Sequence, residues 1–472
     1  MRAVIDAPAA TGRRYLEIWA KHRGGYDGFM VNQDTQQHVI QACRDHDVKF
    51  IRLWFTDILG MLKSVAITIE ELEHALSDGV SFDGSAIEGF ARHDETDMIA
   101  VPDTSTFQIL PWRPREQAVA RMFCDLQVPG GEPFAGDPRQ VLKRVLSKAA
   151  AAGYTFYISP EIEFFYFKDS SGTEPLDSGG YFDLTPLDGG SDLRRETVLA
   201  LEQMGIGVAL SHHEAAPSQH EMDLRYTDAL TMADAVMTYR LLVKEVAMRH
   251  GVYATFMPKP LANENGSGMH LQLSLFQGEE NAFYSGADDL KISTVARRYI
   301  AGLLREAPEL MLLTNQWVNS YKRLVPGTEA PLYATWSPKS HSDLVRVPEY
   351  KPGLEVSTRI EYRVPDSACN PYLAFAGVLA AGLRGIEEEL PLPEPVSAAT
   401  DQLSSEEIDA RGLHALPGSL GEAIDLFEGS TFLRESLGDH VFDSIVANKK
   451  IEWSEYRSQV TQFEIDRYLP RL

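Results

Sequence analysis

The chain has 472 residues, of which 44% are hydrophobic and 24% are charged, a balance that is ordinary for a folded globular protein and unlike a disordered or fibrous one. Its length exceeds the size at which one core usually stops growing, so two or more domains are expected. With 44 basic and 68 acidic residues the formal net charge is −24, which disfavours binding to nucleic acid or to anionic membranes.

The N-terminal segment, residues 1–34, is expected to form an appended helix around residues 15–22 and a linker, and it lacks the apolar stretch of a signal peptide. The longest apolar run, residues 373–383, is too short to span a bilayer. The cysteines show no paired spacing, so neither a disulfide framework nor a zinc motif is indicated; they are Cys43, Cys124 and Cys369. These features predict a cytoplasmic enzyme that does not enter a membrane.

A small sheet-and-helix domain is predicted next. A helical pattern from residue 35 leads into a strand at 48–55, rich in β-branched and aromatic residues, and a turn separates it from a second strand at 64–69. A passage rich in proline and glycine at residues 125–138 ends this region. The expected division is therefore an N-terminal extension, a small domain and a large domain, over residues 1–34, 35–130 and 131–472.

The large domain alternates strands with long helices. Helices are predicted at residues 139–152 and 228–250, the second from apolar residues at spacings of three and four, and strands at 155–167 and 270–276. Both kinds of element are therefore expected to pack together in the large domain.

Ionisable residues alternate with apolar ones in several predicted strands, which points them to one face. Glu161 and Glu163 would lie ~6.7 Å apart on one face. Two bare carboxylates at that distance would repel by about 2.5 kcal/mol at an effective dielectric of about 20, and a cation between them removes the conflict. An isolated Glu-x-Glu is more often an exposed, solvated face, but the aromatic residues at 164–167 favour burial here.

The same alternation places His270, Gln272 and Ser274 on one face, directly after a glycine loop that lets backbone amides approach a ligand. A lone histidine of this kind is usually structural, and a single arginine usually forms a surface ion pair. Six residues nevertheless form a set that suits two or more Mg²⁺ or Mn²⁺ ions: Glu161, Glu163, Glu214, Glu221, Glu361 and His270. Four arginines would bind phosphates and a substrate carboxylate: Arg323, Arg346, Arg359 and Arg363.

This combination predicts phosphoryl transfer to an acid. The sequence contains no G-x-x-x-x-G-K-[ST] loop and no G-x-G-x-x-G after a strand, so metals and arginines would have to hold the nucleotide.

The order of the motifs from about residue 48 onwards resembles the bacterial type I glutamine synthetase family. The matching segments include Phe55-Thr56-Asp57, Phe82-Asp83-Gly84-Ser85, Pro160-Glu161-Ile162-Glu163-Phe164-Phe165, Gly180-Tyr181-Phe182, His212-His213-Glu214, Asn265-Gly266-Ser267-Gly268-Met269-His270, Asn319-Ser320-Tyr321-Lys322-Arg323 and Asn370-Pro371-Tyr372. The resemblance implies an α+β fold, with a β-grasp domain and a catalytic domain that has a funnel of antiparallel β-strands flanked by helices. It also implies a dodecamer of two hexameric rings with active sites between subunits.

By matching position, the resemblance implies two metal sites and an ATP site. One metal would be held by Glu163, Glu214 and Glu221, and the other by Glu161, His270 and Glu361. ATP would be contacted by Ser274, Arg346 and Arg359, and Arg346 would also be catalytic.

The resemblance also implies where the other substrates bind. Asp57, from a neighbouring subunit, would help deprotonate the incoming ammonium, and Glu329 would close a flap over the site. Glutamate would be bound by Asn265, Gly266, Arg323, Glu329 and Arg363. The amine pocket would contain Asp57, Tyr181, Glu214, Thr328 and His341.

Four positions depart from the family pattern and bear on which amine is used. Ala86 replaces a serine, Thr328 stands where a bulky aromatic is usual, and His341 replaces an arginine; Asp401 falls where regulated members carry a tyrosine that is adenylylated. Ammonia is the default acceptor. The alternative is an organic amine, such as a polyamine, ethanolamine, an alkylamine or an aromatic amine. A catalytically silent relative is a remote third possibility, disfavoured because every metal-position carboxylate is retained.

Overall fold

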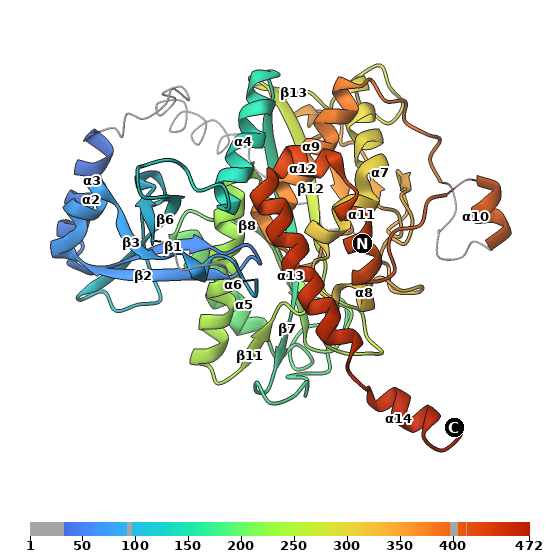
Figure 1. Ribbon diagram of the computed structural model, residues 1–472, viewed down its shortest axis with the longest axis horizontal. Coiled ribbons are helices and arrows are strands. Elements are labelled where there is room, and N and C mark those ends of the chain that lie inside the picture. Colours follow the sequence, from blue (N-terminus) through green and yellow to red (C-terminus); the bar gives the residue numbers. More distant parts are fainter. Residues whose placement is uncertain (1–32, 92–96, 397–404, 412) are drawn as a thin grey trace.

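The computed structural model describes residues 33–91, 97–396, 405–411 and 413–472. A small lobe at the N-terminal end, blue in Figure 1, lies beside a larger lobe built from one extended sheet and many helices. The helix expected at residues 15–22 and the position of Asp401 lie outside the described residues. No helix within the described ranges has both the length and the apolar character needed to cross a membrane.

The small lobe is a six-stranded sheet with the strand order β2-β1-β6-β4-β3, and β5 pairs with β6. β1 and β6 run parallel, and the remaining pairs are antiparallel. The elements are α2 (Gln33–Asp45), β1 (Val48–Thr56), β2 (Leu62–Thr68), α3 (Leu72–Asp78), β3 (Val80–Asp83), β4 (Asp97–Pro102), β5 (Gln108–Ile109) and β6 (Ala118–Gln127). Apolar residues of the strands and of α2 and α3 form their own core. The predicted β-grasp domain is confirmed.

The large lobe contains a ten-stranded sheet with the order β14-β15-β16-β12-β7-β9-β8, and shorter strands pair with β7 and β12. Every pair is antiparallel except β14 with β15. The strands are β7 (Thr155–Phe167), β8 (Val208–His213), β9 (Gln219–Leu224), β10 (Thr227–Asp228), β11 (Tyr253–Thr255), β12 (Met269–Gln277), β13 (Glu280–Asn281), β14 (Trp336–Ser337), β15 (Val345–Arg346) and β16 (Ile360–Tyr362). The predicted α+β class and the mainly antiparallel catalytic sheet are confirmed.

Helices cover the apolar face of this sheet (Figure 1). Ile158 and Ile162 of β7 belong to the same buried core as residues of α4, α6, α7 and α9. A Cβ on Gly302 of α7 would lie 2.2 Å from the backbone oxygen of Ala381 in α9, so glycine permits this close crossing. The helices are α4 (Pro138–Ala151), α5 (Ser191–Gln203), α6 (Ala229–Arg249), α7 (Thr294–Thr314), α8 (Ser320–Arg323), α9 (Pro371–Glu387), α10 (Ser405–Arg411), α11 (Leu420–Glu428), α12 (Thr431–Leu437), α13 (Asp439–Arg457) and α14 (Gln462–Tyr468).

Buried polar contacts join the two lobes. Arg139 of α4 forms ion pairs with Asp103 and Asp125 of the small lobe, at 2.8 and 2.7 Å, and with Asp234 of α6 at 2.9 Å. The side-chain amide of Asn370 donates to the backbone oxygen of Asp57 at 3.2 Å. The turn after β1 is thereby fixed against the start of α9.

The predicted elements agree closely with the observed ones. The strand expected at residues 155–167 is β7 to the residue, and the helices expected at 139–152 and 228–250 are α4 and α6 within one residue at each end. The strand that carries Glu361 is short. β16 covers only Ile360–Tyr362, so Arg359 and Arg363 flank it.

Candidate active site

The register of the large sheet brings ionisable residues of four strands together. Glu161 of β7 lies opposite His270 of β12 on one side and opposite Asp223 of β9 on the other. Two residues further along β7, Glu163 lies opposite Glu221. Residues that face each other directly in an antiparallel pair have Cβ atoms about 5 Å apart. The apolar residues between them point into the helical layer, so the opposite face of the sheet carries the charges.

The first group of potential metal ligands comprises Glu161, His270 and Glu361, whose ligand atoms all lie within 4.8 Å of one another. His270 Nδ1 is 3.6 Å from Glu161 Oε2. Burial, together with the nearby Arg363 guanidinium, lowers the pKa of His270 well below its usual value. The imidazole is therefore neutral and keeps a nitrogen lone pair for a cation.

The second group comprises His212, Glu214 and Glu221, again within 4.8 Å. Burial and the neighbouring Glu163 and Glu161 raise the pKa of Glu221 well above its usual value. Glu163, expected in this group, lies opposite Glu221, but its Oε2 accepts hydrogen bonds from the backbone of Gly268 at 2.9 Å and the side chain of Gln219 at 3.1 Å.

Buried carboxylates crowd around the second group. Burial and the nearby Glu214 raise the pKa of Glu163 to about 8, and burial with Glu221 and Glu161 raises the pKa of Asp223 to about 10. Groups so close to one another cannot all ionise without added positive charge. The oxygen-rich donor sets, each with an imidazole, therefore fit divalent cations such as Mg²⁺ or Mn²⁺.

Arginines surround the first group. Glu361 is almost fully buried and accepts a hydrogen bond from Arg346 Nε at 2.9 Å and another from Arg363. Arg359 Nε donates to the side chain of Gln272 at 2.9 Å. Gln272 lies two residues before Ser274 on β12, so Ser274 is on the same strand face, one step further from the first group.

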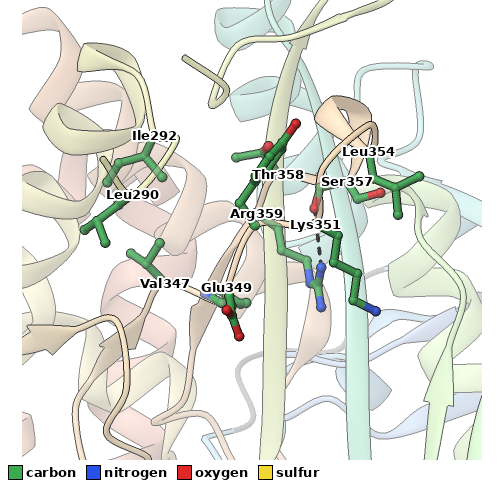
Figure 2. A pocket seen from close by; sticks show the side chains of 11 residues that line it. Leu290, Ile292, Val347, Glu349, Lys351, Leu354, Ser357, Thr358 and Arg359 are labelled. Atoms are coloured by element: carbon green, nitrogen blue, oxygen red, sulfur yellow. Dashed lines mark hydrogen bonds between the residues drawn. The ribbon is translucent and has the colours of Figure 1, made fainter. Parts of the chain in front are cut away.

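A pocket adjoins Arg359 (Figure 2). Its wall combines apolar side chains such as Leu290 and Val347 with the charged Glu349 and Lys351. Arg359 Nη1 donates to the backbone oxygen of Ser357 at 3.3 Å, which holds the guanidinium at the edge of this pocket.

The glycine loop before β12 lies close to Arg323. A Cβ on Gly266 would lie 2.3 Å from the backbone oxygen of Pro258, and a Cβ on Gly268 would lie 2.5 Å from Arg323 Nη2. Arg323 is buried and donates to the backbone oxygen of Val364 at 2.8 Å. Asn265, which precedes Gly266, is half-buried. The loop and the Arg323 guanidinium therefore lie against each other.

The residues expected in the amine pocket are partly brought together. Burial and the nearby carboxylates of Glu214, Glu221 and Glu329 raise the pKa of Tyr181 to about 12. The Thr328 hydroxyl donates to the backbone oxygen of Arg323 at 2.8 Å, and Glu329 adopts a left-handed backbone with φ of 51°.

His341 also lies near this group. Burial and the Arg363 and Arg346 guanidinium groups lower its pKa, and its backbone oxygen accepts a hydrogen bond from Arg363 Nε at 2.8 Å.

Asp57 stands apart from this group. Its carboxylate accepts hydrogen bonds from the backbone of Leu59 and Met61, at 3.0 and 2.8 Å, and lies 3.3 Å from Lys63 Nζ. These partners belong to the small lobe. Burial raises the pKa of Asp57 above its usual value.

Sequence reasoning missed three residues of this region. His212 lies in a segment whose carboxylates were counted but whose histidines were not. Gln219 and Asp223 share the charged face of β9 with Glu221, and the two-residue spacing is the signal that would have found them.

Two groups of side chains that could hold divalent cations lie near four arginines, an arrangement suited to an enzyme that acts on carboxylate or phosphate groups with the help of metal ions. Residues 47–129 match the family model "Glutamine synthetase, beta-Grasp domain", and residues 135–468 match "Glutamine synthetase, catalytic domain". The chain belongs to the glutamine synthetase family. It is a ligase, and its family uses ATP and divalent metal ions to ligate glutamate.

Individual relatives agree with this assignment. The glutamine synthetase of Mycolicibacterium smegmatis is 53% identical over 92% of this chain and 99% of its own length, and that of Mycobacterium tuberculosis is 51% identical over the same shares. Among solved structures, the ADP complex of GmaS, γ-glutamylmethylamide synthetase, is 31% identical with a TM-score of 0.83, over 92% of this chain and 99% of that one.

Proposed function

We propose that the protein joins the γ-carboxylate of glutamate to an amine through a γ-glutamyl phosphate intermediate, with ammonia as the default acceptor. The observation that carries the proposal is the convergence of Glu161, His270 and Glu361 on one point, with Arg346 and Arg363 both bound to Glu361. This arrangement supports the transfer of a phosphoryl group to a bound carboxylate. The division of the chain at residues 34 and 130 is part of the same proposal.

The metal sites in this proposal are those expected from the sequence: Glu161, His270 and Glu361 for one ion, and Glu163, Glu214 and Glu221 for the other. Divalent ions bound there would neutralise phosphate charge in the phosphoryl transfer. Arg346 and Arg359, with Ser274, would bind the phosphates and nucleotide of ATP, because guanidinium groups match phosphate oxygens in geometry and charge.

The remaining residues would bind glutamate and the amine. Arg323 and Arg363, with Asn265 and the Gly266 backbone, would hold glutamate, and Glu329 would close the site so that water does not hydrolyse the activated carboxyl group. An ammonium ion has no lone pair for attack, so a base must first remove a proton. Asp57 of a neighbouring subunit would serve as that base.

A second acceptor class is supported by three observations. Thr328 is small, and its hydroxyl is bonded to backbone oxygens of its own loop rather than filling the pocket. His341 replaces an arginine of the family pattern. The similarity to γ-glutamylmethylamide synthetase adds a relative named for an organic amide product. An organic amine, such as an alkylamine, ethanolamine, a polyamine or an aromatic amine, is therefore the alternative acceptor.

The proposed assembly is a dodecamer of two hexameric rings with active sites between subunits. The position of Asp57 supports it, because within its own chain Asp57 contacts the small lobe and the start of α9 rather than the carboxylates of the large sheet. Native mass spectrometry tests the assembly directly. A monomer that turns over with full activity would contradict it.

The test of the acceptor is phosphate release with glutamate, Mg-ATP and a panel of amines beside ammonia. Release with ammonia and weaker release with every organic amine is the expected result. A strong preference for one organic amine would identify the alternative acceptor. Release with none of them would mean that the chain is a catalytically silent relative and would overturn the proposal.

A further inference from the structure

We infer that Lys259 is a positioning residue for glutamate, because its ammonium group holds the loop of residues 259–266 in the shape that presents Asn265 and Gly266 to the substrate. The inference deepens the proposed function and rests on its assignment of these two residues to glutamate binding. Lys259 itself belongs to none of the proposed metal, nucleotide or substrate contacts.

The loop that begins at Lys259 has no helix or strand to hold it. Residues 259–266 connect β11 to β12 outside both strands, and Ala262 and Asn263 are exposed. The end that would meet glutamate is different, because Gly266 and Ser267 are buried. Backbone groups outside a helix or a sheet need other partners, so the shape of this end depends on individual hydrogen bonds.

A buried ammonium group supplies one of these bonds. Lys259 is only 8% exposed, and its Nζ donates to the backbone oxygen of Glu264, five residues further along the chain. That oxygen belongs to the peptide group that joins Glu264 to Asn265. Hydrogen bonds from a charged donor are stronger than neutral ones. The bond therefore fixes the orientation of the peptide that leads into Asn265.

The backbone of Lys259 is itself held rigidly. Its N–H donates to Asn319 Oδ1 at 2.7 Å, and its carbonyl oxygen accepts from Asn319 Nδ2 at 3.1 Å. Pro258 and Pro260 flank Lys259. Proline restricts its own φ and also the backbone of the residue before it. An ammonium group on a residue fixed in this way can hold a neighbouring loop in place.

The far end of the loop returns to the same point. The Ser267 N–H donates to the backbone oxygen of Pro258 at 2.8 Å, next to Lys259. The glycine at 266 permits this closure, since a Cβ there would lie 2.3 Å from the same oxygen and 2.9 Å from Arg323 Cγ. The loop thus lies directly against Arg323, the proposed partner of glutamate. Loss of the bond from Lys259 would let the Asn265 and Gly266 backbone move away from the substrate.

The test replaces Lys259 by methionine in the full chain and combines kinetics with hydrogen exchange. We expect the KM for glutamate to rise by about 10–100-fold, as for the loss of one charged hydrogen bond, while kcat and the KM for ATP stay within about threefold of the wild type. The Ser267 and Gly268 amides are hydrogen-bonded in the closed loop and should exchange about tenfold faster without substrate. A general loss of stability would not raise the KM for glutamate alone.

Lys291→Met is the matched control. Lys291 Nζ also donates to a backbone oxygen five residues away, that of Gly286 at 3.0 Å, but this bond is exposed and lies in the segment before α7. The control should keep the wild-type KM for glutamate and the wild-type exchange at Ser267. If Lys259→Met does not fold, Lys259→Gln takes its place, because its side chain is one bond shorter and uncharged.

Two results would overturn the inference. The first is exchange at Ser267 and Gly268 equal to that in the control, because the loop would then not depend on Lys259. The second is faster exchange with an unchanged KM for glutamate, which would also refute the assignment of Asn265 and Gly266 to glutamate binding. A wild-type chain that releases no phosphate with glutamate would refute the proposed function, and the exchange comparison would still decide whether Lys259 holds the loop.

Discussion

Replacing Glu361 by glutamine probes the residue on which the phosphoryl-transfer proposal depends most. Glu361 is 2% exposed, and its two oxygens accept hydrogen bonds from Arg346 and Arg363 while it also belongs to the first metal group. A hydrogen bond to a charged group contributes about 1.5–3 kcal/mol, so two amount to about 3–6 kcal/mol. An amide can accept at only one of the two positions.

The expected effect of Glu361→Gln follows from these contacts. At 1.36 kcal/mol for each factor of ten, the loss of one of these hydrogen bonds, about 1.5–3 kcal/mol, corresponds to a loss of about 10–150-fold in kcat/KM. Glutamine has nearly the same shape, so the sheet should remain folded. The loss should be accompanied by weaker binding of Mn²⁺, because one charged ligand is removed.

Two assays check this prediction: phosphate release at increasing Mg²⁺ concentration, and a Mn²⁺ binding titration. Circular dichroism confirms that the variant is folded. Glu174→Gln, at an exposed residue paired with Lys168, is the control and should match the wild type. If Glu361→Gln keeps Mn²⁺ affinity and kcat/KM within about threefold of the control, the assignment of Glu361 to the metal site is refuted.

Three further predictions concern stability and acceptor choice. Burial raises the pKa of Asp137 to about 7. Because this value exceeds the pKa in the unfolded chain, the wild-type protein loses stability as pH rises from about 4 to 7. Asparagine does not ionise, so the free energy of unfolding of Asp137→Asn should increase by about 2–3 kcal/mol relative to that of the wild type between pH 5 and 8. Chemical denaturation measures this difference, and a constant difference contradicts it. Thr328→Phe should narrow the acceptor pocket and lower kcat/KM for alkylamines relative to ammonia by about 10–200-fold. If the ratio of the two kcat/KM values does not change, Thr328 does not line the acceptor pocket. Mg²⁺ at about 100 times its Kd should add about 2.7 kcal/mol to the free energy of unfolding, seen as a higher melting temperature, and Glu221→Gln should reduce this shift; an equal shift in both proteins would exclude Glu221 as a ligand.

The secondary structure around the site was predictable because the local signals were strong. β7 combines a run of β-branched and aromatic residues with alternating carboxylates, and its bounds were predicted to the residue. α6 was equally clear, because its apolar residues recur with the helical period. The face shared by Glu161 and Glu163 followed from the two-residue period of a strand.

The detailed membership of the second group was harder to predict. β8 carries a register irregularity between Val208 and Leu210, so simple alternation does not tell which of His212 and His213 faces the carboxylates. The structure turns His212 towards Glu221 and His213 towards Asp177. The burial of Asp223 between neighbouring strands likewise depends on register, which is a tertiary property. The proposed role of Asp57 depends on a second chain and stays a prediction.

The most direct test of the central claim follows oxygen atoms through the reaction. The protein is incubated with Mg-ATP, ammonia and glutamate whose γ-carboxylate is labelled with ¹⁸O, and the released phosphate is analysed by mass spectrometry. If ATP phosphorylates the γ-carboxylate, one labelled oxygen must leave with the phosphate when the amine attacks the carbonyl carbon. We predict phosphate that contains one ¹⁸O atom. Phosphate without label, released at the same rate as the amide forms, would contradict the γ-glutamyl phosphate route.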